Sequence, residues 1–122
     1  MTSRERVTLA LNHSEPDRVP VDFGATAVTG MHATTVYKLR QVLGLDAPGT
    51  PIKVVEPFQL LGEIDDDLRD ALGIDTVPLE GRKTLYGFVK KGWKPWTFHD
   101  GTPLLVPRSE EHTSELQSPN TI

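Results

Sequence analysis

Residues 15–23 read EPDRVPVDF, and this stretch decides the fold that the sequence predicts. Within it, residues 19–23 form a short apolar run bounded by sequence breakers, which is typical of a buried strand. Gly24 follows and lets the chain turn, and residues 24–30 are small and flexible, as a loop over a pocket would be. We therefore expect residues 19–23 to be the first strand of an α/β fold.

Three other segments have the pattern of short helices. Thr2 and Glu5 have the spacing of a capping box, in which the Thr2 hydroxyl accepts from the Glu5 amide and the Glu5 carboxylate reaches back to the Thr2 amide. Residues 32–43 repeat apolar side chains every three or four positions. Residues 65–67 are three aspartates that suit the first turn of a third helix. The first helix should end near Asn12 or His13, because the residue before Pro16 disfavours helix. Gly44 and Gly73 can end the other two.

The remaining apolar segments predict extended structure and one tight turn. Residues 74–79 have the composition of a second buried strand, and residues 52–55 suit a brief extended piece. We expect a helical turn over residues 58–64. Residues 96–106 predict a hairpin around the dipeptide Asp100-Gly101, because this pair favours a tight hairpin turn.

Strands that alternate with helices imply parallel strands joined by right-handed crossovers. Two such strands cannot close a sheet by themselves, so the pattern is that of the opening of a larger fold. The strands missing from it would leave the apolar sides of several residues without partners: Val19, Val21, Phe23, Ile74 and Val77.

Composition narrows the class of protein. A length of 122 residues suits one small domain, and 37% hydrophobic with 25% charged residues is ordinary for a globular protein. The absence of cysteine excludes disulfides and thiolate metal sites within the chain and fits a reducing cytoplasm. The net charge of −4 disfavours nucleic acid as a partner. The N-terminus has no long apolar run, so we expect neither a signal peptide nor a membrane partner.

The chain resembles the N-terminal part of proteins of the uroporphyrinogen decarboxylase family. The residues that carry the resemblance are 4–7 (RERV), 9–13 (LALNH), 15–22 (EPDRVPVD), 65–68 (DDDL), 72–79 (LGIDTVPL) and 100–103 (DGTP). They are similar to the family's first helix, its first strand, a helix with the second strand, and a hairpin inserted in bacterial members. The resemblance spans about residues 3–107. It implies an incomplete (β/α)₈ barrel made of the first strands and helices plus a hairpin insertion, since a whole barrel usually needs about 250 residues.

The resemblance leaves two activities open for the parent enzyme. The decarboxylases bind an acidic tetrapyrrole through arginines in the loop after strand one, because guanidinium groups pair with carboxylates bidentately. Here the matching loop, residues 24–31, contains no arginine, and Arg40 lies farther along on the predicted helix. Related methyltransferases work with corrinoid proteins and use zinc to activate a thiol. We favour a methyltransferase-type parent acting on a methyl donor over a true decarboxylase of porphyrin biosynthesis.

Zinc and a corrinoid are accordingly expected for the full-length parent, with a corrinoid protein as its partner, and no cofactor is expected in this fragment. The His and Cys ligands of zinc fall in the later part of the family's barrel. We expect the fragment itself to be inactive, because a barrel active site draws residues from several strands. A free-standing α/β binding module is the alternative, and it would need residues 1–107 to close their own core.

Two residues are candidate catalytic groups. Asp22 lies at the carboxyl end of strand one, where barrel enzymes keep their active sites, and could orient a substrate or a base. The other interpretation is that Asp22 is a carboxylate at a strand end that accepts hydrogen bonds from amides of the loop. His32 follows the flexible loop and could face a pocket, or could be a helix-start histidine with no catalytic role.

Other polar and aromatic groups have two interpretations each. Residues 65–67 are a solvated helix start or, less simply, a site for a divalent metal. Asp75 could project into the barrel as a functional group, or it could make a hydrogen bond inside the barrel. Residues 93–96 (WKPW) could stack on a flat ligand or cover the small core of the hairpin itself.

The C-terminal residues have a different origin from the rest in this interpretation. Residues 108–118, RSEEHTSELQS, resemble the translation of a short-read sequencing adapter, and residues 119–122 fit the index that follows it. The alternative is a polar, disordered natural tail. We therefore divide the chain into residues 1–107, the N-terminal part of the barrel, and residues 108–122, a non-native disordered tail.

Overall fold

The computed structural model describes residues 1–79 and 92–107, so the predicted tail at residues 108–122 lies outside the described part. Within it the fold is mixed α/β, as the sequence predicts. The elements in chain order are α1 (Ser3–Leu11), α2 (Ala33–Val42), β1 (Ile52–Glu56), β2 (Leu61–Gly62), α3 (Asp66–Leu72), β3 (Lys94–Thr97) and β4 (Pro103–Val106).

The predicted helices are confirmed, and so are their local start and stop signals. Thr2 caps α1, and its hydroxyl oxygen accepts from the Glu5 amide at 3.1 Å. The return bond differs from the prediction, because the Thr2 hydroxyl itself donates to the Glu5 carboxylate. Gly44 and Gly73 follow α2 and α3 with φ of 71° and 67°, a left-handed conformation that costs glycine little.

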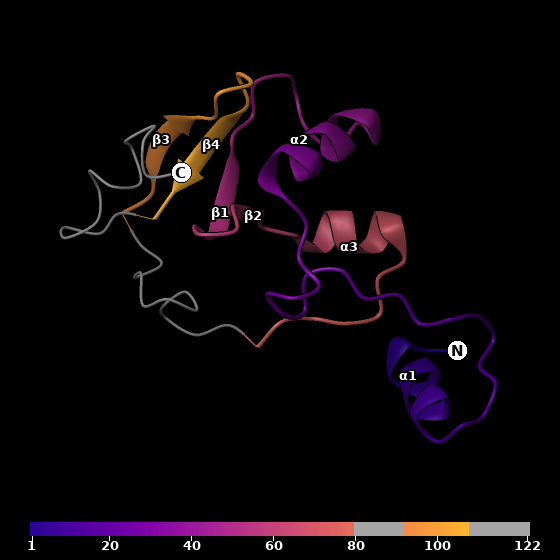
Figure 1. The fold of residues 1–122 in the computed structure, drawn as a ribbon. Coiled ribbons are helices and arrows are strands. Elements are labelled where there is room, and N and C mark those ends of the chain that lie inside the picture. The colour runs from indigo at the N-terminus through magenta and orange to yellow at the C-terminus, as the bar shows by residue number, and fades with distance from the viewer. Residues whose placement is uncertain (80–91, 108–122) are drawn as a thin grey trace.

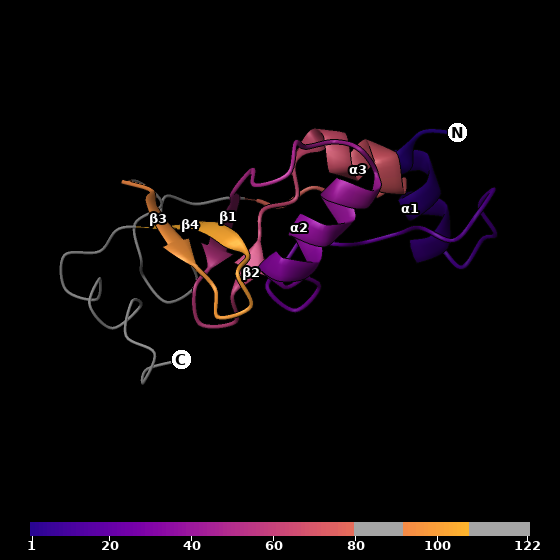
Figure 2. The same cartoon turned by 90° about the horizontal axis from the view of Figure 1, so that it is seen from above.

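The described strands form one sheet in the order β2-β1-β4-β3. β3 and β4 are the predicted hairpin, with Gly101 at φ 93° in its turn. β1 confirms the extended piece at residues 52–55, and it pairs with β4 in parallel. In Figures 1 and 2, α2 and α3 lie next to the edge of the sheet that β1 and β2 form. α1 lies at the end of the molecule opposite to β3.

Three predictions of secondary structure were wrong. Residues 19–23 and 74–79 are not strands: they have no regular secondary structure, and Phe23 lies in a bend. Pro20 and Pro78 have no N–H to donate to a ladder, and the amide of Val21 donates to a side chain instead of a neighbouring strand. Residues 58–64 are not helical, because the turn after β1 leads directly into β2.

The core lies between α2, α3 and the sheet. Its buried apolar residues are Ala33, Val36, Ile52, Val54, Leu60, Ile64, Leu68, Ile74, Leu104 and Val106. Two glycines allow the close approach that this packing needs. A Cβ at Gly62 would lie 2.8 Å from Cγ2 of Val36, and one at Gly30 would lie 2.5 Å from Cδ1 of Leu61. Gly30 of the 24–30 loop therefore permits tight packing against β2.

The apolar residues expected to lack partners divide into two groups. Val19 and Val77 are 79% and 65% exposed, and Phe23 is 42% exposed, as predicted. Ile74 is buried and Val21 packs against the core, so the prediction was wrong for these two. Among the described helices, none is long and apolar enough to span a membrane.

Candidate functional site

Two segments far apart in the sequence lie side by side and form the candidate site. The amide of Asp75 donates to the carbonyl of Val21 at 2.8 Å, and the amide of Val21 donates to the Asp75 carboxylate at 2.9 Å. Both segments run in the same direction in Figure 1, below α3. We call this junction of residues 19–23 and 73–79 the seam.

A buried carboxylate holds the seam together. The side chain of Asp75 is fully buried, and it accepts from Ser3 Oγ at 2.8 Å, from Arg6 Nη1 at 2.5 Å and from Arg18 Nη1 at 2.9 Å. Burial alone would raise the pKa of Asp75, but the hydrogen bonds from Val21, Ser3 and the two arginines bring it well below its usual range. Asp75 is therefore ionised, and its hydrogen bonds run to α1, Arg18 and the Val21 amide.

Arg6 connects α1 to this cluster and to a second carboxylate. Its Nε and Nη2 donate to the two oxygens of Asp17 at 2.7 and 3.0 Å, which is bidentate pairing. The hydrogen bond from Arg6 is the largest cause that lowers the pKa of Asp17 to about 2. Arg6 is also the buried residue of α1. Charged groups, more than apolar packing, thus attach α1 to the rest of the chain.

Asp22 lies at the carboxyl end of the first segment of the seam. Its side chain accepts from the amide of Ala25 at 3.3 Å, from Thr29 Oγ1 at 3.4 Å and from Thr76 Oγ1 at 2.7 Å. The bond to the loop amide agrees with the structural interpretation of this residue. The bond to Thr76 crosses the seam, so Asp22 also ties the ends of the two segments together.

His32 lies elsewhere, at the start of α2. Its Nδ1 accepts from the amide of Thr34 at 3.2 Å, and its ring meets the edge of the Phe98 ring at a centroid distance of 5.3 Å. Asp22 and His32 have no partner in common in the described part of the chain. The two predicted catalytic residues therefore belong to different surroundings.

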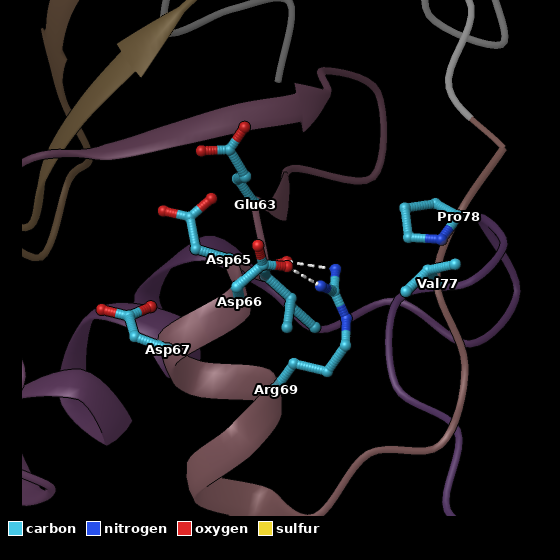
Figure 3. A pocket seen from close by; sticks show the side chains of 8 residues that line it. Glu63, Asp65, Asp66, Asp67, Arg69, Val77 and Pro78 are labelled. Atoms are coloured by element: carbon cyan, nitrogen blue, oxygen red, sulfur yellow. Dashed lines mark hydrogen bonds and ion pairs between the residues drawn. The ribbon is translucent and has the colours of Figure 1, made fainter. Parts of the chain in front are cut away.

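An open groove of about 560 Å³ borders the seam (Figure 3). Acidic side chains from the start of α3 line one side, and Val77 and Pro78 line the other. Arg69 pairs with Asp66, and Asp67 accepts from Nη2 of Arg40 at 2.6 Å. These aspartates are engaged in ion pairs, and residues 1–79 and 92–107 contain no group of three or more acidic, His or Cys residues that could hold a metal ion.

Sequence reasoning named Asp75 but missed its arginine partners. One signal was present, because Arg6 precedes Leu9 and Ala10 by three and four residues and shares their face of the helix. A charged residue on the apolar face of a short helix indicates a buried partner.

No family model, curated protein or solved structure matches the chain. The seam and the sequence resemblance therefore carry the functional argument.

Proposed function

We propose that residues 1–107 are the N-terminal part of a barrel enzyme of the uroporphyrinogen decarboxylase family. The observation that carries this proposal is the seam. Two segments that lie side by side, run the same way and are joined by a connection containing α2, β1, β2 and α3 support it, because neighbouring barrel strands are also parallel and joined by a helical crossover. Asp22 would then lie at the carboxyl end of the barrel, where substrates bind.

Exposed apolar side chains along the seam support the same proposal. Val19 and Val77 are mostly exposed, and Leu79 is fully exposed. Leaving three aliphatic side chains in water on two adjacent segments is unfavourable, by up to about 1.5–3 kcal/mol for each compared with full burial. Further strands and helices of a parent enzyme would cover these residues.

Between the two branches of the family, we favour methyl transfer through a corrinoid over tetrapyrrole decarboxylation. The strand-one loop contains no arginine. Arg40, the nearest one after it, is buried and donates to Asp46 and Asp67, so it has no free face for a substrate carboxylate. Hydroxyl groups surround Asp22 instead, from Thr29 and Thr76. Such neutral donors suit the orientation of an uncharged methyl donor or thiol better than the binding of a polycarboxylate.

The zinc site of that branch uses Cys ligands, and this sequence contains no cysteine. The family resemblance places the zinc ligands in later parts of the parent enzyme. The role proposed for this chain is to supply Asp22 and the first wall of the barrel. The chain alone is expected to be inactive and poorly soluble.

A free-standing binding module is the second candidate function. The buried core between α2, α3 and the sheet favours it, because these residues exclude water without help from other strands. That hypothesis expected the hairpin to cover the two predicted strands. Instead, the hairpin extends a sheet that contains β1. A module of this kind would elute as a monomer and unfold in one sharp transition.

The genomic sequence downstream of codon 107 provides the decisive test. We expect the reading frame to continue into further strand–helix units with His and Cys ligands, and the longer protein to bind zinc and transfer a methyl group from a methylcorrinoid to a thiol. Replacing Asp22 by Asn in that protein should lower kcat, with Asp70→Asn as the matched control, because Asp70 is also exposed and lies on α3, away from the seam. A frame that stops near codon 107 would refute the barrel proposal, and decarboxylation of uroporphyrinogen would refute the methyl-transfer branch.

A further inference from the structure

A second, smaller pocket lies away from the seam, at the carboxyl ends of two parallel strands. Its volume is about 150 Å³, close to the space that one six-membered aromatic ring requires. Pro57 directly follows β1, and Val106 is the last residue of β4. Both line the pocket. In sheets with parallel strands, ligands bind in crevices beyond the carboxyl ends of the strands.

Aromatic rings form its walls. Trp96 and Phe98 line the pocket, with their ring centroids 6.0 Å apart and their planes at 72°. His32 lines it as well and meets Phe98 edge-on at 65°. Rings set at steep angles to one another present both a face and an edge to a flat guest, which is the geometry that aromatic pairs prefer.

The floor of the pocket is held in place by a buried carboxylate. Glu56 is 3% exposed, and its two oxygens accept from the amides of Phe58 and Gln59 at 3.2 and 2.6 Å. Leu60 ends this turn with φ at 55°, and its carbonyl accepts from the first amide of α2 at 2.8 Å. A turn fixed at both ends does not have to be ordered when a ligand arrives, so less free energy is lost on binding.

His32 offers the ligand one polar contact, in which the ring donates a hydrogen bond. Nδ1 accepts from the amide of Thr34, so in the neutral ring the proton is on Nε2. Within the described part of the chain, Nε2 has no hydrogen-bond partner. A ligand that meets this nitrogen must therefore present an acceptor.

The absence of charged side chains among the described lining residues indicates a ligand without net charge. The described residues of the wall are His32, Pro57, Phe58, Gln59, Leu60, Trp96, Phe98 and Val106, and none of them is Asp, Glu, Lys or Arg. Carboxylates, phosphates and cations would lose their hydration here without gaining an opposite charge. We propose that this pocket binds a neutral, planar heteroaromatic molecule whose ring nitrogen or carbonyl oxygen accepts from Nε2 of His32. This site is independent of the barrel proposal, because none of its lining residues belongs to the seam.

Pyridine and benzene form a matched pair of probes, since they share a ring and differ by one acceptor. The 122-residue chain, labelled with ¹⁵N, is titrated with each probe in the same buffer. We expect saturable shifts at Gln59, Trp96 and Phe98 with a Kd for pyridine on the order of 1 mM. Benzene should bind about 3- to 10-fold more weakly, because it cannot accept the hydrogen bond.

Variants separate the polar contact from the ring contacts. His32→Asn keeps an acceptor at the N-cap of α2 but removes the imidazole, so the preference for pyridine should fall to within about twofold. Phe98→Leu should weaken both probes. His13→Asn is the matched control, since His13 is exposed with φ at 59° and asparagine tolerates that conformation.

A measurement on the unaltered chain covers the case in which a variant does not fold. Pyridine, but not benzene, should shift the ¹⁵N resonance of Nε2 of His32. The proposal is overturned if neither probe gives a saturable shift, if benzene binds as well as pyridine, or if His32→Asn leaves the preference unchanged. None of these outcomes bears on whether the reading frame continues past codon 107.

Discussion

Replacing Asp75 by Asn is the sharpest test of how this chain is held together. The substitution keeps the size of the side chain but removes its charge and turns one accepting oxygen into an amide nitrogen that donates. The two oxygens of Asp75 now accept from Ser3, Arg6, Arg18 and the amide of Val21. Whichever way the new amide is oriented, at least one buried donor loses its acceptor.

The cost follows from the burial of each partner. Breaking a buried ion pair by removing one member costs about 3–5 kcal/mol. The lower end applies here, because Arg6 keeps its pairing with Asp17 and the Arg18 side chain, 43% exposed, can be solvated by water. We expect the free energy of unfolding to fall by about 3 kcal/mol, out of a total of about 5–15 kcal/mol for a protein domain.

Urea unfolding followed by tryptophan fluorescence measures this loss. With an m-value of about 1.5 kcal/mol per molar urea, the midpoint should fall by roughly 2 M. Hydrogen exchange adds a local readout, since the amides of α1 should lose protection before those of β4. Asp22→Asn is the matched control, because Asp22 is exposed and its donors are neutral, and it should cost less than about 1 kcal/mol. A loss below about 1 kcal/mol for Asp75→Asn, or an equal loss for Asp22→Asn, would refute the role given to the buried carboxylate.

Three further predictions concern packing, pH and solubility. Gly62→Ala should lower stability by about 1–3 kcal/mol in urea unfolding, because its Cβ would overlap Cγ2 of Val36 at 2.8 Å, and an unchanged midpoint would contradict this. Asp17 has its pKa lowered to about 2 by Arg6, so its contribution should be complete above about pH 4 and lost as the pH falls through 2; urea midpoints measured from pH 7 to 2 that do not fall would contradict it. Leu79→Lys should raise the soluble fraction of the expressed chain, because this fully exposed side chain adds to the apolar surface of the seam, and an unchanged fraction would weaken the barrel proposal.

Local signals in the sequence were sufficient for the helices and the hairpin. Thr2 at the start of α1, Gly73 at the end of α3 and the Asp100-Gly101 turn act through neighbours in the chain. Their effects are therefore present before any tertiary contact forms. The order and approximate bounds of these elements were predictable for that reason.

The pairing of the strands was not predictable in the same way. Residues 19–23 and 74–79 have the composition of buried strands, yet the sheet is built from β1, β4 and their neighbours. Apolar composition shows that a segment prefers burial, but it does not show which backbone will accept its hydrogen bonds. That choice depends on segments that are distant in the sequence.

The candidate site shows the same division. The sequence alone determined that Asp22 ends an extended segment, that His32 begins a helix, and that Asp75 is a polar residue among apolar ones. Only the tertiary structure decided that Arg6 and Arg18 converge on Asp75 and that His32 joins Phe98 rather than Asp22. The physical reason is range, since caps and turns act over three or four residues, whereas a buried charge is stabilised by partners that only the folded chain brings within hydrogen-bonding distance.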